Sequence, residues 1–298
     1  MKPYQNILVG INYTDASRHA LRKAGQIARR TGGELTAYHV IPSPGFDEYT
    51  SFYSIEHAEM FKAAKSSLES FVDEVLGENH NVQCLVREGV PHHEVVSYAN
   101  DCDIDLIILG DDDYAENPRR SAQFAIKTLR FATMPVLLVN RPEQENDHTV
   151  SACVDFSKST DSVLHHAANF ANINGGPVEI NHVCSPPWLR SEFLRYQTEV
   201  FEDEDQKAQF REILEGQITA IATRASKTSN AEILTKTIEA EHPVNALIEH
   251  LSPAGRGLVV IGRTGKGLKG IVADFLGGTT EVLIRHARHP ILVIPILD

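Results

Sequence analysis

Short, nearly continuous apolar runs alternate along the chain with stretches in which apolar residues recur at helical spacing. After the run at 7–12, apolar residues starting at Ala20 fall at i, i+1, i+4, i+7 and i+8, which is one face of a helix. Strands that are apolar on both faces and alternate with helices are typical of a parallel sheet covered on both sides. The pattern therefore predicts an α/β fold with a doubly wound, Rossmann-like parallel sheet.

The same order of elements occurs twice. Long helices are predicted at about 54–76 and about 190–226, and shorter helices begin near Pro91 and Pro243. The predicted strands are 7–12, 35–41, 82–87, 105–109 and 135–139, and again 150–155, 178–184, 232–238, 257–261 and 290–294.

The residues themselves repeat in register. A single offset of 143 aligns about thirty residues of the two halves, and the offset then grows to 152 and to 155. Growth confined to intervening loops is what surface insertions produce. The aligned pairs include Asn12 with Asp155, Gly32 with Gly175, His39 with His182, Pro91 with Pro243, and Pro135 with Pro290.

Two domains follow from the repeat and from the length of 298 residues. The polar stretch 141–148 reads as a linker, so we expect domains at 1–144 and 145–298. The last strands, 135–139 and 290–294, are apolar and would leave exposed sheet edges if unpaired. We therefore expect the two domains to pack as a pseudo-dimer.

Composition excludes some partners. The net charge is −12, and an acidic surface repels nucleic-acid backbones and anionic membranes. No apolar run reaches the roughly 18 residues of a membrane span, and the N-terminus lacks a signal-peptide pattern. The four cysteines are scattered, as in a reducing compartment. We expect a cytoplasmic protein that neither binds nucleic acid nor inserts into membranes.

The segment after the strand at 257–261 is the candidate for chemistry. It is rich in glycine and carries Arg263, Lys266 and Lys269, against the acidic average. Glycine lets backbone N–H groups approach an anion closely. The run 277–280 would open a helix that ends near His289, and a helix N-terminus attracts anions. The segment therefore predicts a phosphate site.

Two better-known phosphate motifs do not apply. Residues 265–270 spell GxGxxG, but that fingerprint belongs after the first strand of a dinucleotide-binding unit. Residues 262–267 have Walker A glycine spacing, but Leu268 and Lys269 stand where Lys and Ser or Thr are required.

The loop resembles the motif of the universal stress protein family, G-2x-G-9x-G-[S/T]. Gly262 and Gly265 match its first half, and Gly267 with Gly277 match its second, so the loop is two residues longer than the family norm. Gly278 stands where the family has Ser or Thr, with Thr279 as a substitute hydroxyl. The resemblance spans nearly the whole chain twice, which identifies a tandem universal stress protein with two adenine-nucleotide α-hydrolase-like domains.

The resemblance also implies the ligand and its contacts. Asp155 matches the acid that ends strand one in the family, and Val183 matches a residue of the adenine pocket. Asp155 is open to a second interpretation, since an acid here also suits a helix cap. The implied ligand is ATP, with or without Mg²⁺. The implied binding residues are Val154, Asp155, Val183, Gly262, Thr264, Gly265, Gly267, Gly277, Gly278, Thr279 and Thr280.

The first copy departs from the motif. Asn12 replaces the acid, and the loop at 111–118 has no glycine pair but four carboxylates where phosphates would lie. Like charges at short range oppose binding. We expect a degenerate, structural first domain, with the pair Arg119 and Arg120 as the one feature that suits another anion.

Three functions remain open. The first is a stress-response protein that binds adenine nucleotide in its second domain, with a regulatory role and little or no turnover. The second is a scaffold whose aromatic-rich segments 42–62 and 184–210 hold an apolar ligand or a protein partner. The third is a slow ATP hydrolase. No catalytic residue is predicted, and adjacent histidines such as His92 and His93 face different ways on a helix, so no metal site is predicted either. A protein partner or a homodimer of the tandem chain fits the first two readings.

Overall fold

The structure, a computed structural model, describes residues 3–43, 54–78, 80–110, 122–142, 144, 148–189, 203–252, 256–264, 276–286 and 289–295. These residues form two compact units. The first holds the described residues up to 142 and Leu276, and the second holds those at 144–264 and 277–295. How the two predicted domains pack against each other stays a prediction.

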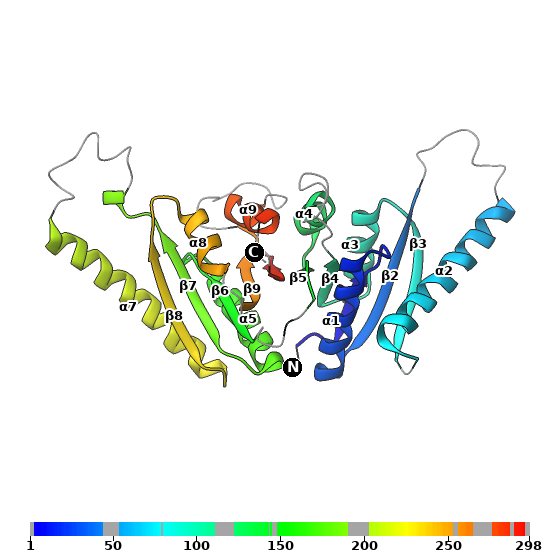
Figure 1. Cartoon of the computed structure of the whole chain (residues 1–298), viewed down its shortest axis with the longest axis horizontal. Helices are drawn as coiled ribbons and strands as arrows, with labels where there is room; N and C mark the ends of the chain where they lie inside the picture. The colour runs from blue at the N-terminus through cyan, green and yellow to red at the C-terminus, as the bar shows by residue number, and fades with distance from the viewer. Residues whose placement is uncertain are drawn as a thin grey trace. The chain divides into compact units, whose positions relative to one another are not determined.

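The first unit is a five-stranded parallel sheet with the order β3-β2-β1-β4-β5. Helices α1 and α2 pack side by side on this sheet, and α3 packs on it beside α4 (Figure 1). Its elements are β1 (Asn6–Gly10), α1 (Asp15–Thr31), β2 (Glu34–Pro42), α2 (Ser54–Leu76), β3 (Val82–Gly89), α3 (Pro91–Asp101), β4 (Leu106–Gly110), α4 (Ala122–Phe131) and β5 (Val136–Val139).

The second unit repeats this architecture with the order β8-β7-β6-β9-β10, again with parallel pairing. Helices α5 and α7 pack together, as do α8 and α9 (Figure 1). The predicted doubly wound α/β fold is confirmed for both units. The elements are β6 (Thr149–Cys153), α5 (Thr160–Asn174), β7 (Val178–Cys184), the 3₁₀ turn η2 (Pro187–Leu189), α7 (Glu204–Thr228), β8 (Ile233–Glu239), α8 (Pro243–Leu251), β9 (Arg256–Gly262), α9 (Gly278–His286) and β10 (Ile291–Ile294).

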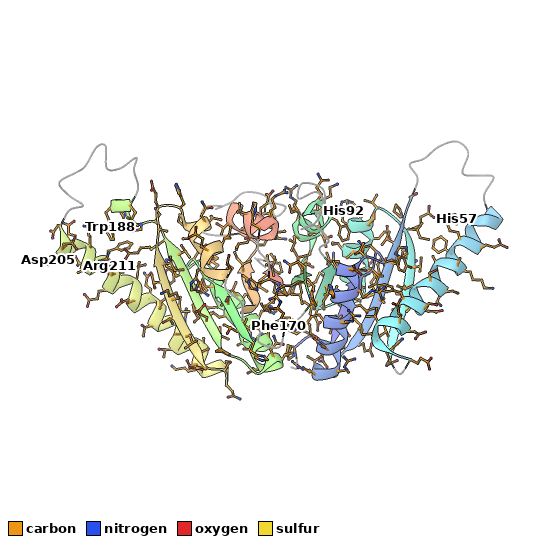
Figure 2. All side chains as sticks on the ribbon, in the orientation of Figure 1. His57, His92, Phe170, Trp188, Asp205 and Arg211 are labelled. Atoms are coloured by element: carbon orange, nitrogen blue, oxygen red, sulfur yellow. The ribbon has the colours of Figure 1, made fainter. Side chains whose placement is uncertain are left out.

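The repeated helical pattern forms the core of each unit. The apolar face that begins at Ala20 is buried in α1, and its counterpart in α5 buries Phe170 completely (Figure 2). Both helices end at a glycine in the left-handed conformation, Gly32 with φ 74° and Gly175 with φ 75°. An L side chain is strained there, so glycine ends both helices at the same point. No helix in the described part of the chain has the length and apolarity to cross a membrane.

Some predicted boundaries were wrong. The first strand of each copy ends two residues early, at Gly10 and Cys153, because the chain turns at Tyr13 (φ 65°) and Phe156 (φ 56°). Helix α7 begins at Glu204 rather than near 190; residues 190–202 lie outside the described residues. Helix α9 is described as far as His286, and residues 287–288, which adjoin the predicted end near His289, lie outside the described residues.

Candidate functional site

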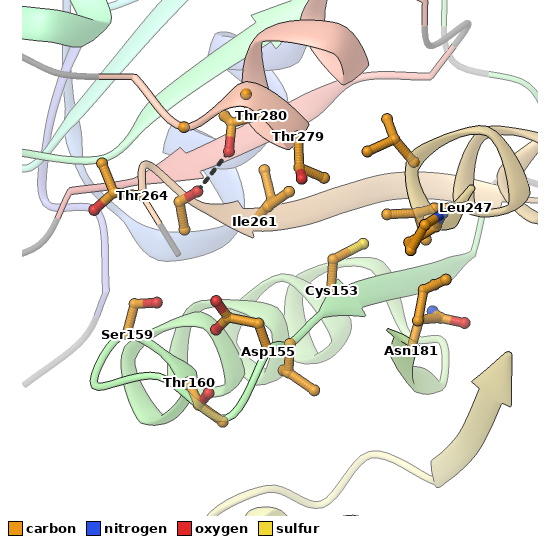
Figure 3. A pocket seen from close by; sticks show the side chains of 17 residues that line it. Cys153, Asp155, Ser159, Thr160, Asn181, Leu247, Ile261, Thr264, Thr279 and Thr280 are labelled. Atoms are coloured by element: carbon orange, nitrogen blue, oxygen red, sulfur yellow. Dashed lines mark hydrogen bonds between the residues drawn. The ribbon is translucent and has the colours of Figure 1, made fainter. Parts of the chain in front are cut away.

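A pocket of about 320 Å³ lies at the carboxyl ends of β6, β7 and β9 in the second unit (Figure 3). The chain winds outward in opposite directions from β6 and β9, and such a switch point leaves a crevice at the strand ends. The pocket is lined by Cys153, Val154, Asp155, Ser159, Thr160, Asn181, Val183, Pro243, Val244, Leu247, Ile261, Gly262, Thr264, Gly277, Gly278, Thr279 and Thr280.

The two ends of the pocket differ in polarity. Leu247 and Asn181 lie at one end of the pocket, and Thr264 and Ser159 lie at the other (Figure 3). Pro243 and Val244, which belong to the same helix α8 as Leu247, also line the pocket. Aliphatic walls suit the face of a flat ring, whereas hydroxyl groups suit an anion or a sugar. The pocket is therefore built for an elongated ligand with one apolar and one polar end.

The polar end contains the start of α9. The Gly277 N–H donates to the Arg263 carbonyl at 2.8 Å, and the Thr280 hydroxyl donates to the Gly262 carbonyl at 2.8 Å, which ties the helix to the end of β9. The backbone N–H groups of 278–280 have no hydrogen-bond partner among the described residues. First-turn N–H groups at the positive end of the helix dipole favour an anion.

Asp155 lines the same pocket but does not cap helix α5. The cap of α5 is Ser159, which makes no side-chain capping bond. One carboxylate oxygen of Asp155 instead accepts from the Ser157 N–H at 3.1 Å, closing the turn between β6 and α5. The helix-cap interpretation of Asp155 was therefore wrong, and its carboxylate belongs to a turn that borders the pocket.

Nine of the eleven predicted binding residues meet in this pocket. Gly265 and Gly267 lie outside the described residues, as do Lys266 and Lys269. The ligand roles of all eleven stay predictions. The nine are Val154, Asp155, Val183, Gly262, Thr264, Gly277, Gly278, Thr279 and Thr280.

Sequence reasoning missed other lining residues. Cys153 and Asn181 each stand two positions before a predicted site residue, Asp155 and Val183. Alternate residues of a strand share a face, so this spacing was a usable signal. Other lining residues reach the pocket because two helices cross the strand ends, and no local sequence pattern predicts them. They are Ser159, Thr160, Pro243, Val244 and Leu247.

The first unit fills the corresponding position with a ring. Tyr38 is the register partner of Gly10, as Asn181 is of Cys153. Its side chain is 2% exposed and its ring lies 4.9 Å from that of Tyr98. Burial, and then the Glu94 carboxylate, raise the pKa of Tyr38 to about 12, so the hydroxyl stays protonated at neutral pH. The acidic loop at 111–118 and the Arg119–Arg120 pair lie outside the described residues.

The histidines of the described residues form no metal cluster, and two equivalent ones contact backbone carbonyls. Among the described residues, no group of three or more His, Cys, Asp or Glu side chains could hold a metal ion. His39 and His182, equivalent in the repeat, lie with Nδ1 at 2.8 Å and 2.9 Å from the carbonyls of Ile11 and Val154. All four cysteines are free thiols.

The universal stress protein family model matches the chain twice, at residues 3–140 and 148–295. The chain belongs to this family. Universal stress protein E of Escherichia coli (strain K12) is 25% identical over 322 aligned residues, covering 99% of this chain and 95% of that protein. A universal stress protein of Mycolicibacterium smegmatis is 26% identical over 152 residues, covering 51% of this chain and 49% of its own length.

Solved structures of the family share the fold. A universal stress protein from Archaeoglobus fulgidus superposes with a TM-score of 0.68 at 18% identity, covering 97% of this chain and 98% of that one. A putative universal stress protein from Pseudomonas aeruginosa gives 0.61 at 18% identity, covering 98% and 94%. The predicted tandem universal stress protein is thus confirmed, and family membership supports a role in stress response.

Proposed function

We propose that the second unit binds one adenine nucleotide, ATP with or without Mg²⁺, and that the chain serves the stress response by binding rather than by turnover. The observation that carries the proposal is the pocket itself. It joins an aliphatic end to a helix start whose first N–H groups have no partner among the described residues.

The apolar end suits the adenine base. Leu247 offers an aliphatic wall at this end, and Val183 is a second aliphatic lining residue. Asp155, which lies on the side of Ser159 and Thr160, offers a carboxylate that can accept from an N–H or a hydroxyl (Figure 3). An adenosine needs both, because its base is flat and weakly polar while its amino group and ribose carry donors. This orientation directs the phosphates toward Thr264 and the start of α9 (Figure 3).

The polar end suits phosphate. The first-turn amides of α9 provide donors without a charged side chain, and the hydroxyls of Thr264 and Thr279 lie beside them. Such a site binds an anion locally even though the chain carries a net charge of −12. Specificity for a nucleotide over a free phosphate then comes from the apolar end.

Slow or absent hydrolysis follows from what phosphoryl transfer requires. The reaction needs a held metal ion, a positioned nucleophile and charge stabilisation acting together. Asp155 is the one carboxylate among the described lining residues, and it borders the β6 turn rather than the α9 start. Binding without that machinery regulates by favouring one conformation of the pocket walls over another.

Calorimetry with purified full-length chain tests the proposal. We expect one site per chain for ATP and for AMP, and no heat of binding for inorganic phosphate at the same concentration. Two equivalent sites per chain would contradict the restriction to the second unit. An absence of binding by either nucleotide would contradict the proposal itself.

A hydrolysis assay at saturating ATP and Mg²⁺ tests the regulatory role. We expect turnover far below a median enzyme rate of about 10 s⁻¹. A Gly277→Val/Gly278→Val double variant controls for contaminating ATPases, since added side chains would block the approach of phosphate. Turnover near the median rate that vanished in this variant would make the chain an enzyme.

The scaffold alternative rests on segments 42–62 and 184–210, much of which lies outside the described residues. The part that is described has a small cluster. The Trp188 ring lies 5.1 Å from the Phe210 ring, and the Arg211 guanidinium lies 5.7 Å from the Trp188 ring (Figure 2). A thermal shift produced by a fatty acid but by no nucleotide would favour this alternative.

A further inference from the structure

His182 contacts both chain neighbours of Asp155. Its Nδ1 lies 2.9 Å from the Val154 carbonyl, and because a carbonyl only accepts, Nδ1 carries the hydrogen. Its ring centroid lies 4.2 Å from that of Phe156. The side chain is 7% exposed and is not among the described residues that line the pocket.

The backbone on which His182 acts needs such support. Phe156 has φ 56°, a left-handed conformation that is uncommon for an aromatic residue and persists only where its surroundings fix it. Val154 is held from its other side as well, since its N–H donates to the Asn181 carbonyl at 2.9 Å. The peptide units on both sides of Val154 are thus anchored to β7, and the Phe156 ring contacts the same strand through His182.

We propose that His182 is a positioning residue for the nucleotide site. Together with Val154 and Phe156 it forms what we call the histidine clamp, which fixes the turn so that the Asp155 carboxylate faces the pocket. This inference rests on the proposed nucleotide binding in the second unit. It adds a residue that acts through Asp155 rather than on the ligand.

The first unit holds a second copy of the clamp. His39 Nδ1 lies 2.8 Å from the Ile11 carbonyl, and the Tyr13 ring lies 4.7 Å from the His39 ring. Tyr13 is also left-handed, with φ 65°, and the residue enclosed is Asn12. No nucleotide is proposed there, so loss of this copy measures the structural effect alone.

Three variants of the full chain separate the roles. His182→Leu removes donor and ring, His182→Asn keeps an N–H near the position of Nδ1, and His39→Leu removes the matched donor in the first unit. We expect His182→Leu to lower the affinity for ATP about tenfold, because loss of one buried hydrogen bond has an effect of this size. His182→Asn should recover most of the affinity that His182→Leu loses. His39→Leu should leave the affinity for ATP unchanged and should lower the melting temperature by about as much as His182→Leu does.

Hydrogen exchange without nucleotide provides an independent readout. The Ser157 N–H is bonded to Asp155, so in His182→Leu we expect faster exchange in a peptide spanning 152–158, and none of this change in His39→Leu. A wild-type chain that binds no nucleotide would contradict the proposed function. The hydrogen exchange of residues 152–158 would then still show, without any ligand, whether His182 fixes the turn.

The results that overturn the inference are distinct from that failure. If wild type binds ATP and His182→Leu binds it equally well, the clamp does not position the site. Equal loss of affinity in His39→Leu and His182→Leu would show a general effect on stability instead. Unchanged exchange at 152–158 in His182→Leu would show that the turn does not depend on the histidine.

Discussion

The two units share strand order, helix ends and histidine clamp, yet they differ at the positions that face the second unit's pocket. Cys153, Asp155 and Asn181 of the second unit correspond to Gly10, Asn12 and Tyr38 of the first. The strand order and the parallel pairing are kept, whereas these three positions, at or just beyond the strand ends, differ. The comparison shows within one chain that a fold and its site are separable.

The difference between Tyr38 and Asn181 is chiefly one of volume. Both side chains are buried, at 2% and 1% exposure, and both leave the second strand of the sheet toward the short helix that begins at a proline. A tyrosine ring there packs against Tyr98 and becomes part of the core. Asparagine is too small to do so, and a pocket remains. Exchanging the two residues is therefore the strongest way to test the comparison.

The largest effect is expected for Tyr38→Asn. Removing a buried ring leaves a cavity, and comparable large-to-small changes cost about 3–5 kcal/mol of the free energy of unfolding. We expect a loss of that size in urea unfolding followed by exchange of first-unit peptides. The control Tyr38→Phe keeps the ring and should cost about 1 kcal/mol at most. A small loss for Tyr38→Asn would mean that the ring is not a core element.

The reciprocal change, Asn181→Tyr, should close the pocket of the second unit. A ring at this position would occupy the end that we assign to the base, so we expect ATP affinity to fall at least about 100-fold, or about 2.7 kcal/mol. Calorimetry measures the loss. Fluorescence of the single tryptophan, Trp188 of this unit, checks that the unit still folds. Undiminished affinity for ATP would show that the base does not bind at this end of the pocket.

The fold was predictable because its signals are local and doubled. Apolar runs, helical spacing and the glycines Gly32 and Gly175 each depend on a few neighbouring residues. The repeat then supplies each signal a second time, at an offset that changes only in the loops. The boundaries failed where one residue takes an unusual conformation. The residue types at Tyr13 and Phe156 do not indicate a positive φ. This conformation depends on a histidine on the next strand.

The site was predictable in part, for a different reason. The residues near the glycine-rich loop and Asp155 follow a spaced pattern, and the pattern indicated them. Leu247 and Asn181 line the pocket through tertiary packing alone. That the Tyr38 ring occupies the equivalent position in the first unit is evident only when the register of β1 with β2 is known. The expectation of a degenerate first unit was based on the loop at 111–118 and overlooked the buried ring of Tyr38.

A smaller effect is expected for Gly278→Val. A Cβ at this position meets no atom of the described residues within 4 Å, so we expect the substitution to leave the fold intact and to obstruct only a ligand at the α9 start. We expect a loss of affinity of about 30-fold, or about 2 kcal/mol. Gly216→Val is the matched control, because Gly216 of α7 also has open space around its Cβ position and lies outside the pocket. Equal affinity in both variants would exclude phosphate from the α9 start.

The smallest effect is expected for Asp155→Asn, which gives the second unit the residue of the first. Asparagine can still accept from the Ser157 N–H, as Asn12 accepts from the Thr14 N–H at 3.4 Å and from its hydroxyl at 2.7 Å, so the turn should survive. What is lost is the charge of an acceptor facing a ligand donor. A charge-assisted hydrogen bond is worth about 1 kcal/mol more than a neutral one, which predicts a five- to tenfold weaker affinity, on the order of that energy.

The reverse substitution, Asn12→Asp, tests whether the charge at this position or the buried ring of Tyr38 accounts for the difference between the two units. If Tyr38 closes the first unit, a carboxylate at position 12 has no ligand to meet, and calorimetry should still count one site per chain. A second site appearing in Asn12→Asp would show that charge, and not the buried ring, separates the two units. In that case Asn12→Asp combined with Tyr38→Phe should bind ATP no better than Asn12→Asp alone, because the side chain at position 38 would not be what keeps nucleotide out of the first unit.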